Sequence, residues 1–135
     1  MEFKLLKGQE LNLLVKDKAL FPNTTFDCGF VEPCDYFCAI DGEEVLAVIP
    51  IAEKEDNIHV EILEVAENKR HSGVGKAFLK ALFEYAVSKN KIITTHNYHE
   101  EQRARLIPEV ERLLKEYPGR LEFYPAAAKH GKACT

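Results

Sequence analysis

The stretch that decides the fold is residues 68–76, Asn-Lys-Arg-His-Ser-Gly-Val-Gly-Lys, which lies between two segments of different periodicity. The apolar run 58–65 before it is typical of a β-strand, and the amphipathic run 74–88 that begins within it is typical of a helix. The first turn of a helix carries unpaired N–H groups and the positive end of the helix dipole. Gly73 and Gly75 let a ligand approach this backbone closely, because glycine has no Cβ. The stretch therefore predicts a cradle for a phosphate group.

Two common phosphate-binding motifs do not fit this stretch. The P-loop requires a glycine five positions before its Gly-Lys pair and Ser or Thr after the lysine, but the sequence has Arg70 and Ala77 there. The dinucleotide-binding motif requires a third glycine, at the position that Phe78 occupies. The pattern that remains is Arg-x-x-Gly-x-Gly, made by Arg70, Gly73 and Gly75. On these six residues alone, a glycine-rich turn without a ligand is the alternative.

Length and composition suit one globular domain over residues 1–135, with 46% hydrophobic and 30% charged residues. The net charge of −4 argues against a general nucleic-acid-binding protein, which would be basic. No apolar stretch approaches the ~20 residues that a membrane span needs, and the N-terminus does not read as a signal peptide. We therefore expect a cytoplasmic protein without a membrane partner, with its cysteines reduced.

The remaining pattern predicts an order of elements on either side of the glycine stretch. Antiparallel strands are expected in the first half, because the turn residues Asp41-Gly42 join two apolar runs as a hairpin. In the second half, a strand, a helix and another strand predict a right-handed unit with parallel strands. Asn90 is expected to end the helix from 74, and Pro108 to kink or split the next helix. The expected elements are a strand at 3–7, a helix at 9–20, strands at 36–40, 45–49 and 58–65, a helix from 74, a strand at 91–95, a helix at 98–116 and a strand at 120–124.

This element order, with Arg-x-x-Gly-x-Gly at the strand-to-helix turn, resembles the GNAT N-acetyltransferase family. The match covers most of residues 36–124 and is strongest over 58–86. The resemblance implies an α/β (α+β) fold, with a mixed, mostly antiparallel sheet, a central βαβ unit and helices on both faces. It implies a monomeric or homodimeric transferase that binds acetyl-CoA and acetylates a primary amine on a small molecule or protein, without nucleic acid. A non-catalytic acyl-CoA sensor or interaction module of the same fold is the alternative.

The resemblance also assigns a cofactor site. In the family, the strand before the loop splays from its parallel neighbour, often at a bulge, and the pantetheine arm pairs with its backbone like an added strand. The pyrophosphate would bind backbone N–H groups of the loop, and Arg70 would support the loop and the phosphates. The implied cofactor-binding residues are Leu63, Glu64, Val65, Arg70, His71, Ser72, Gly73, Val74, Gly75 and Lys76.

The candidates for a catalytic base lie on the strand 58–65. Strand periodicity places His59, Glu61 and Leu63 on one face. The histone-acetylating members that the chain resembles carry a glutamate eleven positions before the first loop motif residue, and here that position is His59. A neutral imidazole is a competent base near neutral pH, and Glu61 could hold or replace it. The alternative is that both are polar residues on a half-exposed strand.

The catalytic acid is harder to assign. Many family members carry a tyrosine in the helix after the 91–95 strand, in a pattern that this sequence does not match. Tyr98 and Tyr117 are possible substitutes, and a structural role is the alternative for each. A metal site is not expected, because Cys28, Cys34 and Cys38 are not spaced like zinc ligands.

Overall fold

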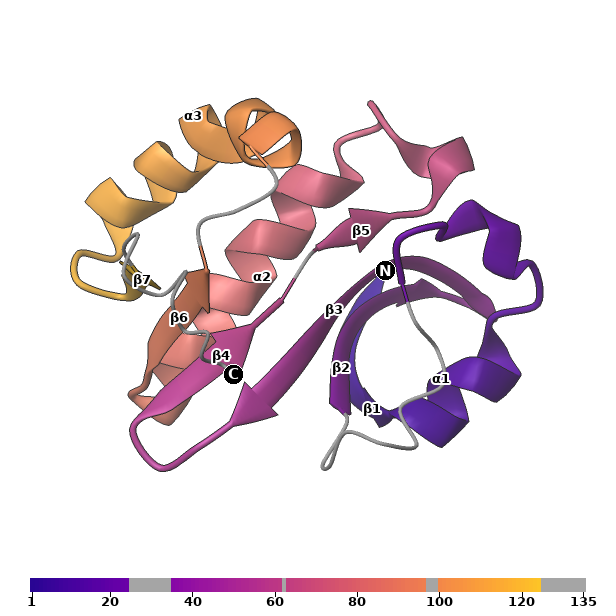
Figure 1. Ribbon diagram of the computed structural model, residues 1–135, viewed down its shortest axis with the longest axis horizontal. Coiled ribbons are helices and arrows are strands. Elements are labelled where there is room, and N and C mark those ends of the chain that lie inside the picture. Colours follow the sequence, from indigo (N-terminus) through magenta and orange to yellow (C-terminus); the bar gives the residue numbers. More distant parts are fainter. Residues whose placement is uncertain (25–34, 62, 97–99, 125–135) are drawn as a thin grey trace.

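The computed structural model describes residues 1–24, 35–61, 63–96 and 100–124 (Figure 1). The strands are β1 (Glu2–Lys7), β2 (Asp35–Asp41), β3 (Glu44–Glu53), β4 (Asn57–Val60), β5 (Glu64–Val65), β6 (Ile92–His96) and β7 (Leu121–Tyr124). The α-helices are α1 (Gly8–Leu14), α2 (Val74–Lys89) and α3 (Glu100–Glu116), and the 3₁₀ helices are η1 (Lys18–Leu20) and η2 (Glu67–Lys69). Among the described residues, no helix combines the length and apolarity needed to cross a bilayer.

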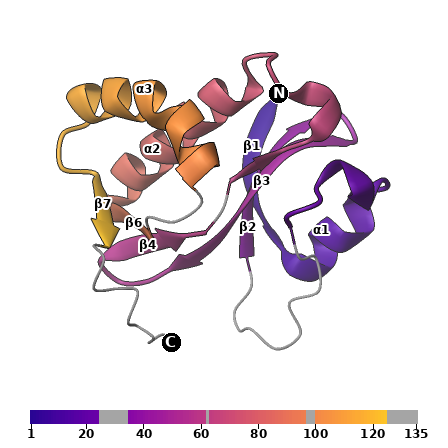
Figure 2. The same cartoon turned by 45° about the horizontal axis from the view of Figure 1, so that its top comes forward.

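The strands form one mixed sheet in the order β1-β2-β3-β4-β6-β7, and β5 pairs with β3. Pairing is antiparallel from β1 to β4, whereas β4–β6 and β6–β7 are parallel. Helices α2 and α3 lie on one face of the sheet and α1 lies on the other, as the two views agree (Figures 1 and 2). This confirms the expected fold class, including the strand–helix–strand unit made by β4, α2 and β6.

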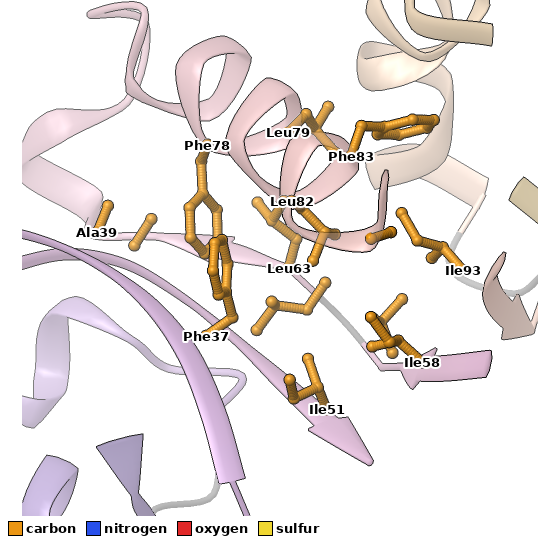
Figure 3. Packing of buried hydrophobic residues seen from close by; sticks show 14 of the residues in the cluster. Phe37, Ala39, Ile51, Ile58, Leu63, Phe78, Leu79, Leu82, Phe83 and Ile93 are labelled. Atoms are coloured by element: carbon orange, nitrogen blue, oxygen red, sulfur yellow. The ribbon is translucent and has the colours of Figure 1, made fainter. Parts of the chain in front are cut away.

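Two apolar clusters hold the layers together, one on each face. The larger lies under α2, where Phe37 of β2 stacks on Phe78 with ring centroids 5.4 Å apart (Figure 3). The smaller lies under α1, around the fully buried Leu11 and Cys38. Burying a side chain as large as phenylalanine contributes about 2–3 kcal/mol, so the α2 cluster is the main anchor of the helix that follows the glycine loop.

β4 and β5 both pair with β3, and a β-bulge lies between them. Ile51 pairs with Val60 and Val48 pairs with Glu64, so a step of three residues on β3 faces a step of four on the other strand. The extra residue breaks the alternation of faces. As a result Leu63 joins Ile58 and Val60 in the cluster under α2. The expectation that Leu63 shares a face with His59 and Glu61 along one continuous strand is therefore wrong.

The three helices can be compared with the predicted helices in the same way. The first helix begins at Gly8 and ends at Leu14, short of the predicted residue 20, and a 3₁₀ turn follows it. Pro108 does not split α3, which runs continuously from Glu100 to Glu116. Asn90 ends α2 in the left-handed conformation, with φ 55°, as predicted.

Candidate active site

The parallel ladder between β4 and β6 ends where the bulge begins. Among the described residues its last pair is Val60 with Thr95, while β5 pairs with β3. Ala66 donates its N–H to Leu46 of β3 at 2.8 Å. Since neighbouring residues of a strand point their N–H and C=O groups to opposite sides, those of Val65 point away from β3. This side of β5 is an edge on which an extended arm could pair like a strand.

The loop after β5 leads into a first turn of α2 whose N-cap residue offers no side chain. Gly73 is that N-cap residue, and the first turn contains no acidic residue. The Ser72 hydroxyl donates to the Lys69 carbonyl instead. The Ala77 N–H bonds back to Gly73 at 3.1 Å, so the N–H groups of 74–76 remain at the positive end of the helix. This arrangement suits a bound anion.

The two glycines of this loop differ in backbone conformation and surroundings. Gly73 has φ +90°, a conformation in which any side chain is strained, and the neighbouring His71 is also left-handed, with φ 64°. A Cβ on Gly75 would lie 3.5 Å from the Val65 Cγ2 atom, which is an ordinary contact. The backbone conformation therefore favours glycine at 73, whereas neither backbone conformation nor packing against the described residues requires it at 75.

Arg70 is turned toward the protein and connects the loop to β5. Its Nε donates to the Val65 carbonyl at 3.0 Å, and its Nη2 lies 3.5 Å from Glu64 Oε2. The side chain keeps 32% of its surface exposed. These contacts describe how Arg70 supports the loop, while its contact with phosphate stays a prediction.

The Glu64 side chain is only 1% exposed and lies in a nest of donors. The Asn23 N–H reaches both carboxylate oxygens, at 3.1 and 3.0 Å, and the Thr24 hydroxyl donates to Oε1 at 2.5 Å. An ionised carboxylate only accepts hydrogen bonds, and Asn23, Thr24 and Arg70 all donate. Glu64 thus joins β5 to Asn23 and Thr24.

A second polar cluster lies on β4 and β6, beside the end of the ladder. His59 Nε2 is 3.3 Å from Glu61 Oε2, and His59 Nδ1 is 3.0 Å from the Thr94 hydroxyl. The Asn57 amide donates to the same hydroxyl at 2.9 Å. The side chains of His59 and Glu61 are 15% and 44% exposed, so the carboxylate faces solvent while the ring is mostly covered.

The structure brings together the two predicted base candidates, His59 and Glu61, and places the predicted loop residues at the start of α2. Tyr98, the candidate acid, lies outside the described residues. Sequence reasoning missed the side-chain roles of Asn57, Thr94 and Glu64. The one available signal was a glutamate at position 64 between apolar residues, which indicates either a solvated edge or a buried ionic contact.

Comparison with known proteins gives one family and a set of similar folds. The model of the acetyltransferase (GNAT) family matches residues 9–107. Tetrahymena GCN5 superposes with a TM-score of 0.61 at 14% identity, covering 92% of this chain and 90% of that one. A ribosomal-protein-alanine N-acetyltransferase from Brucella melitensis biovar Abortus 2308 gives 0.60 at 13% identity, covering 80% and 90%.

An aminoglycoside acetyltransferase from an uncultured soil metagenomic sample, in complex with sisomicin, gives a TM-score of 0.56 at 14% identity, covering 81% of this chain and 85% of that one. At such identities these three structures are similar in fold alone. No curated protein matches the sequence.

Proposed function

We propose that this chain, which belongs to the acetyltransferase (GNAT) family, transfers the acetyl group of acetyl-CoA to a primary amine by direct attack of the amine on the thioester. The single observation that carries the proposal is the edge of β5 that faces away from β3, which leads into the first turn of α2 behind its N-cap glycine. A ligand with an extended amide-containing arm and a pyrophosphate at its end fits both features at once. Coenzyme A has this form.

The proposed cofactor contacts follow the chain from strand to helix. The arm would pair with the backbone of residues 63–65, as a further strand does in β-augmentation. The pyrophosphate would accept hydrogen bonds from N–H groups between His71 and Lys76, at the positive end of α2. The position of Arg70 on the Val65 carbonyl supports this placement, because it fixes the loop relative to the strand edge.

The proposed reaction needs a group that takes a proton from the amine. An amine is protonated at neutral pH, and its nitrogen can attack the thioester carbon only after one proton has left. As the carbon–nitrogen bond forms, the carbon–sulfur bond breaks and its electron pair leaves on sulfur. Glu61 and His59 form the polar pair beside the end of the ladder and are the proposed proton-accepting groups.

A second candidate function is an acyl-CoA sensor that binds the cofactor without turnover. The observation that favours it is the sequence around residue 98, which departs from the family's tyrosine pattern. Coenzyme A thiol is a good leaving group, so transfer does not require a strong acid. The two candidates therefore agree on cofactor binding and differ only in turnover.

Binding and turnover can be tested separately. Acetyl-CoA at millimolar concentration should raise the melting temperature, since a ligand that binds only the folded state stabilises it. Thiol release on a panel of small amines and lysine or N-terminal peptides should then identify acceptors. Stabilisation without thiol release would favour the sensor, and no stabilisation would contradict both functions.

A matched pair of variants tests the cradle itself. Gly75→Glu should abolish acetyl-CoA binding, because it places a negative side chain beside the proposed pyrophosphate site while the fold tolerates a Cβ there. Lys80→Gln changes the net charge by the same amount on an exposed position of the same helix and should bind acetyl-CoA like the wild type. Equal affinities for both variants would place the pyrophosphate elsewhere.

A further inference from the structure

The second polar cluster forms a chain of four side chains that passes through one buried residue and ends at the surface. It begins at Asn57, passes through the buried Thr94, which is 4% exposed, and continues through His59 to Glu61. His59 and Thr94 are direct partners in the parallel register of β4 and β6. Asn57 lies two residues before His59 and therefore on the same face of β4. The pairing of the two strands thus sets the order of the chain.

The hydrogen-bonding capacity of each group restricts where the protons lie. The Asn57 amide nitrogen is a donor, so the Thr94 oxygen accepts from it and keeps its own hydrogen to give. An ionised Glu61 carboxylate can only accept, so the neutral His59 ring must carry its proton on Nε2 to avoid two acceptors facing each other at 3.3 Å. Nδ1 is then unprotonated and accepts from the Thr94 hydroxyl at 3.0 Å.

The reverse arrangement is unfavourable at both ends. A neutral ring with its proton on Nδ1 would direct the lone pair of Nε2 at the Glu61 carboxylate. It would also leave the Thr94 hydroxyl hydrogen without its acceptor on the ring, in a position that is 4% exposed. A buried hydroxyl that loses a partner costs free energy, so the threonine and the glutamate select the same tautomer.

We propose that Asn57 and Thr94 hold the neutral His59 ring with its proton on Nε2, and that His59 is thereby a positioning residue that orients Glu61 as the group accepting the amine's proton. This rests on the proposed function. In the step, one proton passes from the ammonium to the Glu61 carboxylate. The amine nitrogen then bonds to the thioester carbon, and the carbon–sulfur bond breaks with its electron pair on sulfur. The acylated nitrogen gives up its second proton to solvent, which leaves a neutral amide, and the thiolate takes up a proton from solvent. Glu61 then returns its proton to solvent.

The assignment separates the roles of two residues that the sequence left interchangeable. The basic nitrogen of His59 faces the covered Thr94, while the exposed carboxylate of Glu61 can reach a substrate at the surface. Neutral histidine therefore acts through Glu61 rather than on the amine. A histidine held in one tautomer by the hydrogen bond on its other nitrogen is a common means of orienting a catalytic partner.

The tautomer can be observed without knowing the acceptor. Long-range proton–nitrogen NMR correlations on the ¹⁵N-labelled full chain distinguish a ring protonated on Nε2 from one protonated on Nδ1, and loss of one signal in His59→Gln assigns the residue among the five histidines. At a pH where the ring is neutral, His59 should carry its proton on Nε2. A proton on Nδ1, or an even mixture, would overturn the proposal.

Variants of Thr94 then test what holds the ring. Thr94→Val keeps the shape and removes the hydroxyl, and it should yield a tautomer mixture and a roughly tenfold lower kcat with unchanged acetyl-CoA affinity. Thr94→Ser restores the hydroxyl and should restore both. If Thr94→Val does not fold, the wild-type spectrum still decides.

The inference and the proposed function fail in different ways. A wild type that transfers acetyl groups with its His59 proton on Nδ1 overturns the inference and leaves the function standing. A wild type that binds acetyl-CoA but acetylates no amine overturns the catalytic role of Glu61 together with the function. Full turnover by Glu61→Gln would overturn the role of Glu61 alone.

Discussion

Glu61 and Glu64 lie three residues apart on opposite sides of one bulge, and their surroundings are opposite. The Glu61 side chain is 44% exposed and contacts a histidine, whereas that of Glu64 is 1% exposed and is surrounded by an N–H group, a hydroxyl and a guanidinium. An exposed carboxylate can exchange a proton with a substrate. A buried carboxylate holds its hydrogen-bond partners in place. The comparison teaches that residue type alone does not tell a reactive carboxylate from a structural one.

The largest expected effect concerns turnover at the exposed carboxylate. Glu61→Gln should lower kcat about a hundredfold or more, because a positioned base contributes roughly 10²–10⁴ to the rate. Acetyl-CoA affinity, measured by titration calorimetry, should stay near that of the wild type. Glu55→Gln, at another exposed position, is the control and should keep full activity. A loss of affinity in Glu61→Gln would make Glu61 a cofactor-binding residue.

The next effect concerns the contribution of the buried carboxylate of Glu64 to stability. Glu64→Gln should lower the free energy of unfolding by about 2 kcal/mol, because the amide turns its NH₂ toward a donor and the charge that pairs with Arg70 is lost. Glu61→Gln should change it by less than about 0.5 kcal/mol, as is usual for exposed sites. Urea unfolding measures both. Similar losses for the two variants would remove the distinction drawn between the carboxylates.

A smaller effect is expected at Arg70, which is partly exposed. Arg70→Met should destabilise the fold by about 1 kcal/mol, through loss of the hydrogen bond to Val65 and the contact with Glu64. Arg112 of α3 pairs with Glu109 and Glu116 with 47% of its side chain exposed, and Arg112→Met should cost less than Arg70→Met because exposed ion pairs contribute little. Urea unfolding measures both variants. If the two substitutions lower the free energy of unfolding equally, the contacts of Arg70 stabilise the fold no more than a surface ion pair does.

The smallest effect is a change of stability with pH at a third carboxylate, Glu53, which is partly buried. Its hydrogen bond from Tyr85, and then that from Lys91, hold the pKa of Glu53 below its usual range. A carboxyl with a lowered folded-state pKa gives stability that is present above its unfolded pKa of about 4.3 and is lost as pH falls through the folded value. Tyr85→Phe should therefore cost about 1 kcal/mol at neutral pH and less at about pH 3.

Urea unfolding of Tyr85→Phe at the two pH values measures this difference. A cost that stays constant with pH would mean that Tyr85 contributes packing alone. In that case, neighbouring groups would determine the roles of Glu61 and Glu64, but the hydrogen bond from Tyr85 would not contribute to the pH dependence of stability through Glu53.

Much of the scaffold was predictable from local sequence. The helix from Val74, its stop at Asn90 and the hairpin at Gly42 depend on periodicity and on residues that adopt left-handed backbone, and all are present. The extent of the N-terminal helix and the continuity of α3 through Pro108 were not predictable in this way, because tertiary packing can override a local propensity.

The candidate site was likewise predictable only in part from local sequence. The position of the loop and its two glycines at the start of α2 was predictable, because it depends on local sequence, while phosphate binding by this loop stays a prediction. The faces of the residues after Val60 were not, because one extra residue in the pairing with β3 reverses the alternation. Leu63 enters the core for this reason.

By itself, the sequence determined the strand, loop and helix around residues 68–76 and the family to which the chain belongs, because these depend on neighbours along the chain. Only the tertiary structure decided which glutamate is sealed and which is exposed. The partners of Glu64 lie as much as 41 residues away in sequence, and Thr94 lies 35 residues from His59. No local pattern encodes such pairings, because the sheet register and its bulge bring those side chains together.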